Sequence, residues 1–154
     1  MAKAKPRLYR ILLLEDDLEA AGKLLLALGR IEPHLAPFDL DVTLLSTSDA
    51  VKELVNAHPG RRYGIILMDR DCKMNGSFHV LDDMHFTPEN VISISSTPMW
   101  NHVARDRGAV HVIPKSFGDL DGFAERVAQQ VLEMLQGKAR QTPAAERSSP
   151  WSEI

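Results

Sequence analysis

Short apolar runs alternate with helical patterns along the chain from residue 8 onward. The apolar runs predict strands at residues 10–14, 64–68, 91–94 and 109–113, and residues 39–45 predict a further strand in which apolar and polar positions alternate. The intervening periodicity predicts helices at about residues 17–28, 46–56, 77–84, 99–107 and 119–136. In the first helix we expect a buried face made of Leu18, Ala21, Leu25 and Leu28. In the last helix we expect a buried stripe made of Leu120, Phe123, Val127, Val131 and Leu135.

This order of elements predicts an α/β fold built from βαβ units around a parallel sheet. The alternating strand at 39–45 has one polar face, which is typical of an edge, whereas the continuously apolar strand at 64–68 belongs in the centre. Right-handed connections then give a doubly wound five-stranded parallel sheet of flavodoxin-like order 2-1-3-4-5, with helices on both faces. The first and third strands become neighbours at the point where the strand order reverses.

The chain divides into one predicted domain and two short ends. We expect residues 1–6 to be a flexible N-terminus, residues 7–137 to form the domain, and residues 138–154 to form a disordered tail. Gly137 is expected to end the last helix, and the residues after it lack any apolar period. Residues 29–37 contain two prolines and are expected to form a surface loop.

Composition narrows the classes of function. A net charge of −3 argues against a nucleic-acid partner, which needs concentrated Lys and Arg. The single Cys72 excludes an internal disulfide. No segment resembles a signal peptide or is long enough to span a bilayer, so we expect a cytoplasmic protein with no membrane partner.

Polar residues follow four of the five predicted strands. Glu15, Asp16 and Asp17 follow the first strand, Asp69 follows the third, Ser95-Ser96 follow the fourth, and Lys115 follows the fifth after Pro114. The carboxyl ends of parallel strands meet at one edge of a sheet, where ligands of open α/β folds bind. Crowded carboxylates repel one another unless a cation joins them, and Mg²⁺ prefers oxygen ligands. An aspartate can accept a phosphoryl group as an acyl phosphate, and Lys and Ser can bind phosphoryl oxygens.

In this order the residues resemble the receiver domains of two-component response regulators, including the stand-alone chemotaxis type. The resemblance covers about residues 8–135 and is carried by residues 11–17, 66–69, 94–96 and 115–117. It implies that Asp69 is the phosphoacceptor. It also implies that Mg²⁺ is held by Asp16 directly, by Glu15 through water, by Asp69, and by the main-chain carbonyl of Asp71. The phosphoryl-binding and switch positions would be Ser95 with the adjoining Ser96, Lys115 and Val112.

The same resemblance implies a function in a phosphorelay. A histidine kinase or phosphotransfer protein would donate the phosphoryl group, and a downstream protein target would read the modified state. A weak homodimer is compatible with this role. The protein would not be a conventional enzyme, because its only chemistry would be aspartyl phosphoryl transfer to itself and dephosphorylation.

Three positions depart from the receiver pattern and place the usual switch in doubt. Lys73 stands near the position of a usual proline after the phosphoacceptor. Lys115 is preceded by Pro114 and followed by Ser116, whereas receivers usually carry a proline after the lysine. Val112 replaces the aromatic residue that reports activation.

Simpler roles compete with each of these assignments. Asp69 could cap a turn, and Glu15 and Asp16 could favour a helix N-terminus. Lys115 could be a solvated charge, and Ser95 could bond only to backbone. Asp71 could contact the metal, position a hydrolytic water, or be a loop charge.

Two other functions also stay open. The chain could be a degenerate receiver-like binding module that works without phosphorylation. The Asp-x-Asp motif formed by Asp69 and Asp71 also resembles that of haloacid-dehalogenase phosphohydrolases. That motif follows the third strand rather than the first, which disfavours a hydrolase.

Overall fold

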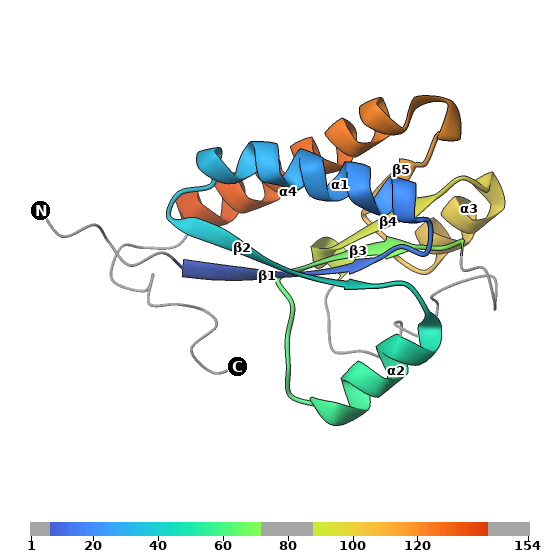
Figure 1. Ribbon diagram of the computed structural model, residues 1–154, viewed down its shortest axis with the longest axis horizontal. Coiled ribbons are helices and arrows are strands. Elements are labelled where there is room, and N and C mark those ends of the chain that lie inside the picture. The colour runs from blue at the N-terminus through green and yellow to red at the C-terminus, as the bar shows by residue number, and fades with distance from the viewer. Residues whose placement is uncertain (1–6, 72–87, 142–154) are drawn as a thin grey trace, which may run out of the picture.

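The computed structural model describes residues 7–71 and 88–141. Within them, five parallel strands form one sheet in the order β2-β1-β3-β4-β5, so the predicted doubly wound topology is confirmed (Figure 1). The strands are β1 (Arg7–Leu14), β2 (Phe38–Leu45), β3 (Ile65–Asp69), β4 (Val91–Ser95) and β5 (His111–Pro114). β2 is an edge strand and β3 lies between β1 and β4, as its continuous apolar run predicted.

Helices cover both faces of the sheet. α1 (Leu18–Ile31) and α4 (Leu120–Gln141) pack side by side on one face, and α2 (Ser48–Ala57) lies on the other (Figure 1). α3 (Pro98–Asp106) contacts β4 and β5. Short 3₁₀ turns are η1 (Glu32–His34), η3 (Pro88–Asn90) and η4 (Phe117–Asp119). The helix predicted at 77–84 lies outside the described residues.

Alternation along the central strands produces two hydrophobic cores. Ile11 and Leu13 face α1 and α4, together with the predicted stripe of α4, which is buried throughout. Leu12 and Leu14 face the opposite core, which includes Val51 of α2. With apolar side chains on both faces, β1 and β3 are held firmly, and so are the residues that follow them.

The buried face of α1 differs from the prediction. Leu18 and Leu25 are 72% and 38% exposed, and Leu24 occupies the centre of the inner face. The other buried positions of the helix are Ala20, Ala21, Ala27 and Leu28. The cause is the closeness of α4, because small alanines let two helices pack against each other and against the sheet at once. The segment at 29–37 also differs from a simple surface loop, since α1 continues to Ile31 and Leu35 is buried.

The C-terminal end of α4 lies beyond the predicted stop at Gly137. The helix continues to Gln141, so the first residues of the predicted tail are helical. A tertiary contact explains this: Lys138 Nζ donates hydrogen bonds to Tyr9 Oη (2.8 Å), Asn90 Oδ1 (3.1 Å) and the Gly64 carbonyl (3.4 Å). Residues 1–6 and 142–154 lie outside the described part, and the division into domain and ends stays a prediction. Among the described helices, none combines the length and apolarity that a membrane crossing requires.

Candidate functional site

The carboxyl ends of four strands bring distant residues together. Leu14 pairs with Met68 in the parallel register of β1 and β3, so Glu15 and Asp69 are adjacent. Ser95 at the end of β4 pairs with Pro114 of β5, which places Lys115 at the same edge. The sheet therefore gathers the polar residues that follow the apolar runs, as the sequence predicted.

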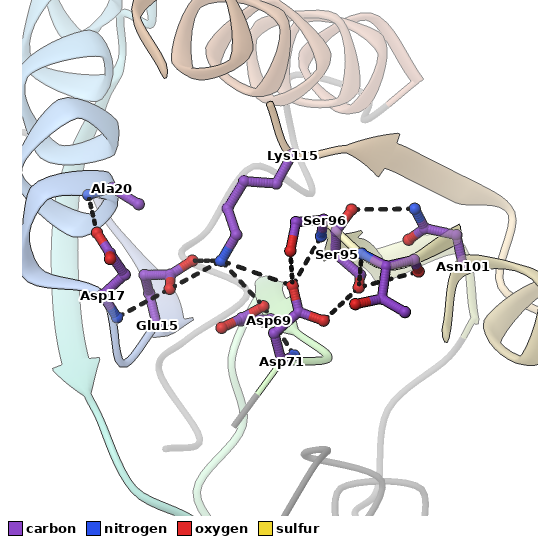
Figure 2. Close-up of polar contacts among 10 residues, drawn as sticks. Glu15, Asp17, Ala20, Asp69, Asp71, Ser95, Ser96, Asn101 and Lys115 are labelled. Atoms are coloured by element: carbon purple, nitrogen blue, oxygen red, sulfur yellow. Dashed lines mark hydrogen bonds and ion pairs between the residues drawn. The ribbon is translucent and has the colours of Figure 1, made fainter. Parts of the chain in front are cut away.

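The Lys115 ammonium lies between two buried carboxylates. Its Nζ donates to both oxygens of Glu15 at 3.1 Å and to Asp69 Oδ1 at 3.3 Å (Figure 2). The Lys115 side chain is 1% exposed, and those of Glu15 and Asp69 are 0% exposed. Charges this deeply buried persist only when they are paired and hydrogen-bonded, so the three side chains depend on one another.

Glu15, Asp16 and Asp69 could together hold a metal ion. One carboxylate oxygen from each lies within 4.8 Å of the others. Asp69 Oδ2 is buried and has no hydrogen-bond partner among the described residues. When all three carboxylates are ionised, their charge exceeds that of the one ammonium, and a divalent cation would balance the excess. Oxygen-only ligands suit Mg²⁺, so the residues present fit this ion.

Burial and mutual repulsion control the protonation of the site. Burial, and then the Glu15 charge, raise the pKa of Asp69 to about 9, against the opposing effect of Lys115. Burial also raises the pKa of Glu15. Burial opposes the charged form of Lys115, but the neighbouring Asp69 and Glu15 raise its pKa overall. Without a metal ion, the carboxyl pair therefore retains a proton at neutral pH.

Asp71 uses its carboxylate in a way that none of the sequence interpretations describes. Its Oδ1 accepts a 2.5 Å hydrogen bond from Ser95 Oγ. Its Oδ2 accepts from the Ser96 amide at 2.7 Å and from Ser96 Oγ at 2.8 Å (Figure 2). The Asp71 amide donates to Asp69 Oδ1 at 2.9 Å. The side chain thus joins the end of β3 to the turn that precedes α3.

Ser95 is fully buried, and its hydroxyl bonds to the main chain as well as to the Asp71 side chain. Its Oγ accepts from the Thr97 amide at 2.9 Å, and its carbonyl accepts from Asn101 Nδ2 at 3.1 Å. Asn101, a buried residue of α3, was missed by the sequence analysis, because a single polar residue in a helix carries no signal of its target. It fixes the main chain that presents the Ser95 hydroxyl.

The remaining predicted positions have lesser or separate places. Asp17 caps α1, accepting from the Ala20 amide at 2.8 Å, and its own amide donates to Glu15 Oε1 at 3.0 Å. Val112 of β5 pairs with Ser93 of β4 and is half-buried there, outside the polar cluster. Cys72 and Lys73 lie outside the described residues.

Comparison with known proteins places this geometry in a known fold. No protein-family model matches the chain, and no curated protein matches its sequence. The crystal structure of the phosphorylated cyanobacterial phytochrome response regulator RcpA matches with a TM-score of 0.65 at 15% identity, covering 87% of this chain and 96% of that one. A two-component response regulator from Cytophaga hutchinsonii matches with a TM-score of 0.55 at 17% identity, covering 86% and 99%. The BeF3-activated receiver domain of Klebsiella pneumoniae RstA matches with a TM-score of 0.53 at 20% identity, covering 81% and 97%.

The chain therefore has the flavodoxin-like fold of response regulator receiver domains. At these identities the matches show a shared fold, and they do not distinguish the chemotaxis type from other receivers. The resemblance found in the sequence is confirmed at that level.

Proposed function

We propose that this chain is a receiver domain that accepts a phosphoryl group on Asp69 from a histidine kinase or phosphotransfer protein in a cytoplasmic phosphorelay. Its modified state would signal through contacts with a downstream protein. The observation that supports this most is the position of Lys115, which binds one oxygen of Asp69 while the other oxygen has no hydrogen-bond partner among the described residues. Most buried carboxylates have both oxygens hydrogen-bonded, so an oxygen without such a partner on a side chain at 0% exposure favours a reactive role for Asp69.

The chemistry follows from these contacts. Asp69 Oδ2 attacks phosphorus, the P–N bond of the donor phosphohistidine breaks, and an acyl phosphate forms on Asp69 while the imidazole nitrogen leaves with the bonding electron pair. Lys115 holds Oδ1, which orients Oδ2 and balances the charge. Glu15, Asp16, Asp69 and the Asp71 carbonyl would hold Mg²⁺, which supplies charge neutralisation for the phosphoryl oxygens.

A receiver-like binding module that is independent of phosphorylation is the second candidate. The hydrogen bonds from Ser95 and Ser96 to Asp71 favour it, because they engage the hydroxyl that would bind a phosphoryl oxygen. A phosphohydrolase is less well supported. Asp71 already accepts three hydrogen bonds, so its carboxylate is poorly placed to serve as an acid or base toward a substrate.

Intact-mass spectrometry with Mg²⁺ and acetyl phosphate tests the proposal. We expect wild type and an Asp39→Asn control, which changes an exposed carboxylate on β2, to gain one phosphoryl group. Asp69→Asn should gain none, a chelator should prevent labelling, and hydroxylamine should remove the label as it does from acyl phosphates. A gain in both wild type and Asp69→Asn, or in neither, would contradict phosphorylation at Asp69. Turnover of a simple phosphate ester that Asp71→Asn abolishes would instead support a hydrolase.

A further inference from the structure

Four donors from two strand ends converge on the Asp71 carboxylate. We call the Ser95 hydroxyl, the Ser96 amide and hydroxyl, and the Lys115 ammonium the oxyanion cradle. The serine donors lie 2.5 to 2.8 Å from the Asp71 oxygens, and Lys115 Nζ lies 3.9 Å from Oδ2. Ser95 and Lys115 are buried and Ser96 is exposed, so the cradle extends from the buried edge of the sheet to the surface.

The composition of the cradle matches an oxyanion with several oxygens. Hydroxyl, backbone amide and ammonium groups are the donors that bind phosphoryl oxygens, and short bonds of this kind are typical of charged acceptors. The cradle also lies beside the phosphoacceptor, because Lys115 contacts Asp69 and Asp71 together. A phosphoryl group on Asp69 would need the same donors.

We propose that Asp71 is an internal anionic competitor, which occupies the oxyanion cradle until a phosphoryl group on Asp69 displaces it. This inference rests on the proposed function. Two anions cannot share these donors, since the phosphoryl oxygens and the Asp71 carboxylate would repel each other at contact distance. Phosphorylation would therefore exchange one anion for another, and the release of Asp71 would free the link between β3 and the turn before α3.

A structural role for Asp71 predicts the opposite effect on anion binding. If Asp71 only holds the turn in place, removing its carboxylate loosens Ser95 and Ser96 and weakens binding of a phosphoryl analogue. If Asp71 competes, removing it vacates the donors and strengthens binding. The direction of the change in affinity separates the two roles.

The test is a beryllofluoride titration in the presence of Mg²⁺. Trp100, in the first turn of α3, serves as the fluorescence reporter in a Trp151→Phe background that removes the other tryptophan. We expect Asp71→Ala to bind at least about tenfold more tightly than the parent, which corresponds to about 1.4 kcal/mol. Asp71→Asn keeps the side-chain shape and an acceptor oxygen but loses the charge, so its affinity for beryllofluoride should lie between those of the parent and of Asp71→Ala. Asp39→Ala should leave the affinity unchanged.

The possible outcomes separate this inference from the proposed function. Equal or weaker binding by both Asp71 variants overturns the competitor role, while binding by the parent that Asp69→Asn abolishes still supports the receiver function. Failure of every protein to bind beryllofluoride contradicts both. Urea unfolding of each variant shows whether it is folded, and if Asp71→Ala is not, the isosteric Asp71→Asn gives the deciding comparison. The Ser96 amide resonance should move on Asp71 substitution even before the analogue is added.

Discussion

Replacing Asp69 by Asn tests the electrostatics on which the site depends. Without a metal ion, burial and the Glu15 charge raise the pKa of Asp69 to about 9 in the folded state, from an ordinary value of 3.8. The folded state thus binds more protons than the unfolded state between these two values. The free energy of unfolding must therefore fall as the pH rises between these two pKa values. Below the lower value both states are protonated, and Asp69 no longer makes the free energy of unfolding depend on pH.

The magnitude follows from one proton per molecule. The slope is at most about 1.4 kcal/mol per pH unit, so the free energy of unfolding of wild type should fall by up to about 2.7 kcal/mol between about pH 6 and pH 8. The proton is shared with Glu15, which makes this an upper bound. In Asp69→Asn, Glu15 retains Lys115 as a simple ion pair, and the slope should be much flatter. We expect the variant to be more stable than wild type by about 1–3 kcal/mol near pH 8.

Urea unfolding in a chelator at several pH values between 6 and 8 measures these slopes, with Asp39→Asn as the matched control. Parallel profiles for wild type and Asp69→Asn would refute the reasoning, because they would show that Lys115 outweighs burial and keeps the Asp69 carboxyl ionised. Adding Mg²⁺ should restore stability to wild type more than to the variant, since the ion replaces the proton as the source of positive charge.

Three further substitutions test the same structure by urea unfolding. Lys115→Met should lower the free energy of unfolding by about 3–5 kcal/mol at pH 8 in a chelator, because Glu15 and Asp69 lose their buried cation. The loss should be smaller at pH 6, where a proton on the carboxyl pair compensates. A loss that does not depend on pH would argue against this cause. Gly64→Ala should cost about 1–3 kcal/mol, because its Cβ would lie 2.4 Å from Cζ of the buried Tyr9 ring. Gly22→Ala, in open space on α1, should instead stabilise by about 0.5–1 kcal/mol, and equal effects of the two alanines would refute the packing argument.

Much of the fold could be predicted because burial imposes a period on the sequence. The alternating strand at 39–45 is the edge strand β2, and the continuous apolar run before Asp69 is the central strand β3. The predictions were wrong where a neighbouring element decided the outcome. Several leucines of α1 offered more than one apolar face, and only the packing of α4 selects the face centred on Leu24. Gly137 lies within α4 because Lys138 is anchored to residues from distant parts of the chain.

The site could be predicted in part for a similar reason. Parallel strands bring their carboxyl ends together, so the closeness of Glu15 and Asp69 followed from the strand order, whereas the pairing of Lys115 with Asp69 rested mainly on the resemblance to receiver domains. The link between Asp71 and Ser95 depends on the shape of the turns after β3 and β4, and apolar periodicity carries no information about these turns. The bond from Asn101 depends likewise on how α3 packs against β4.

The Lys138 anchor has a practical consequence for labelling the molecule. It ties the end of α4 to Tyr9, near the start of β1, whereas the acidic residues follow the last residue of that strand. The strand rises about 3.3 Å per residue, so roughly 20 Å separates the level of Tyr9 from that of Glu15. A dye or affinity handle attached at the C-terminal end of α4 would start from the rim opposite Glu15, Asp69 and Lys115, where it would not obstruct a molecule that approaches these residues.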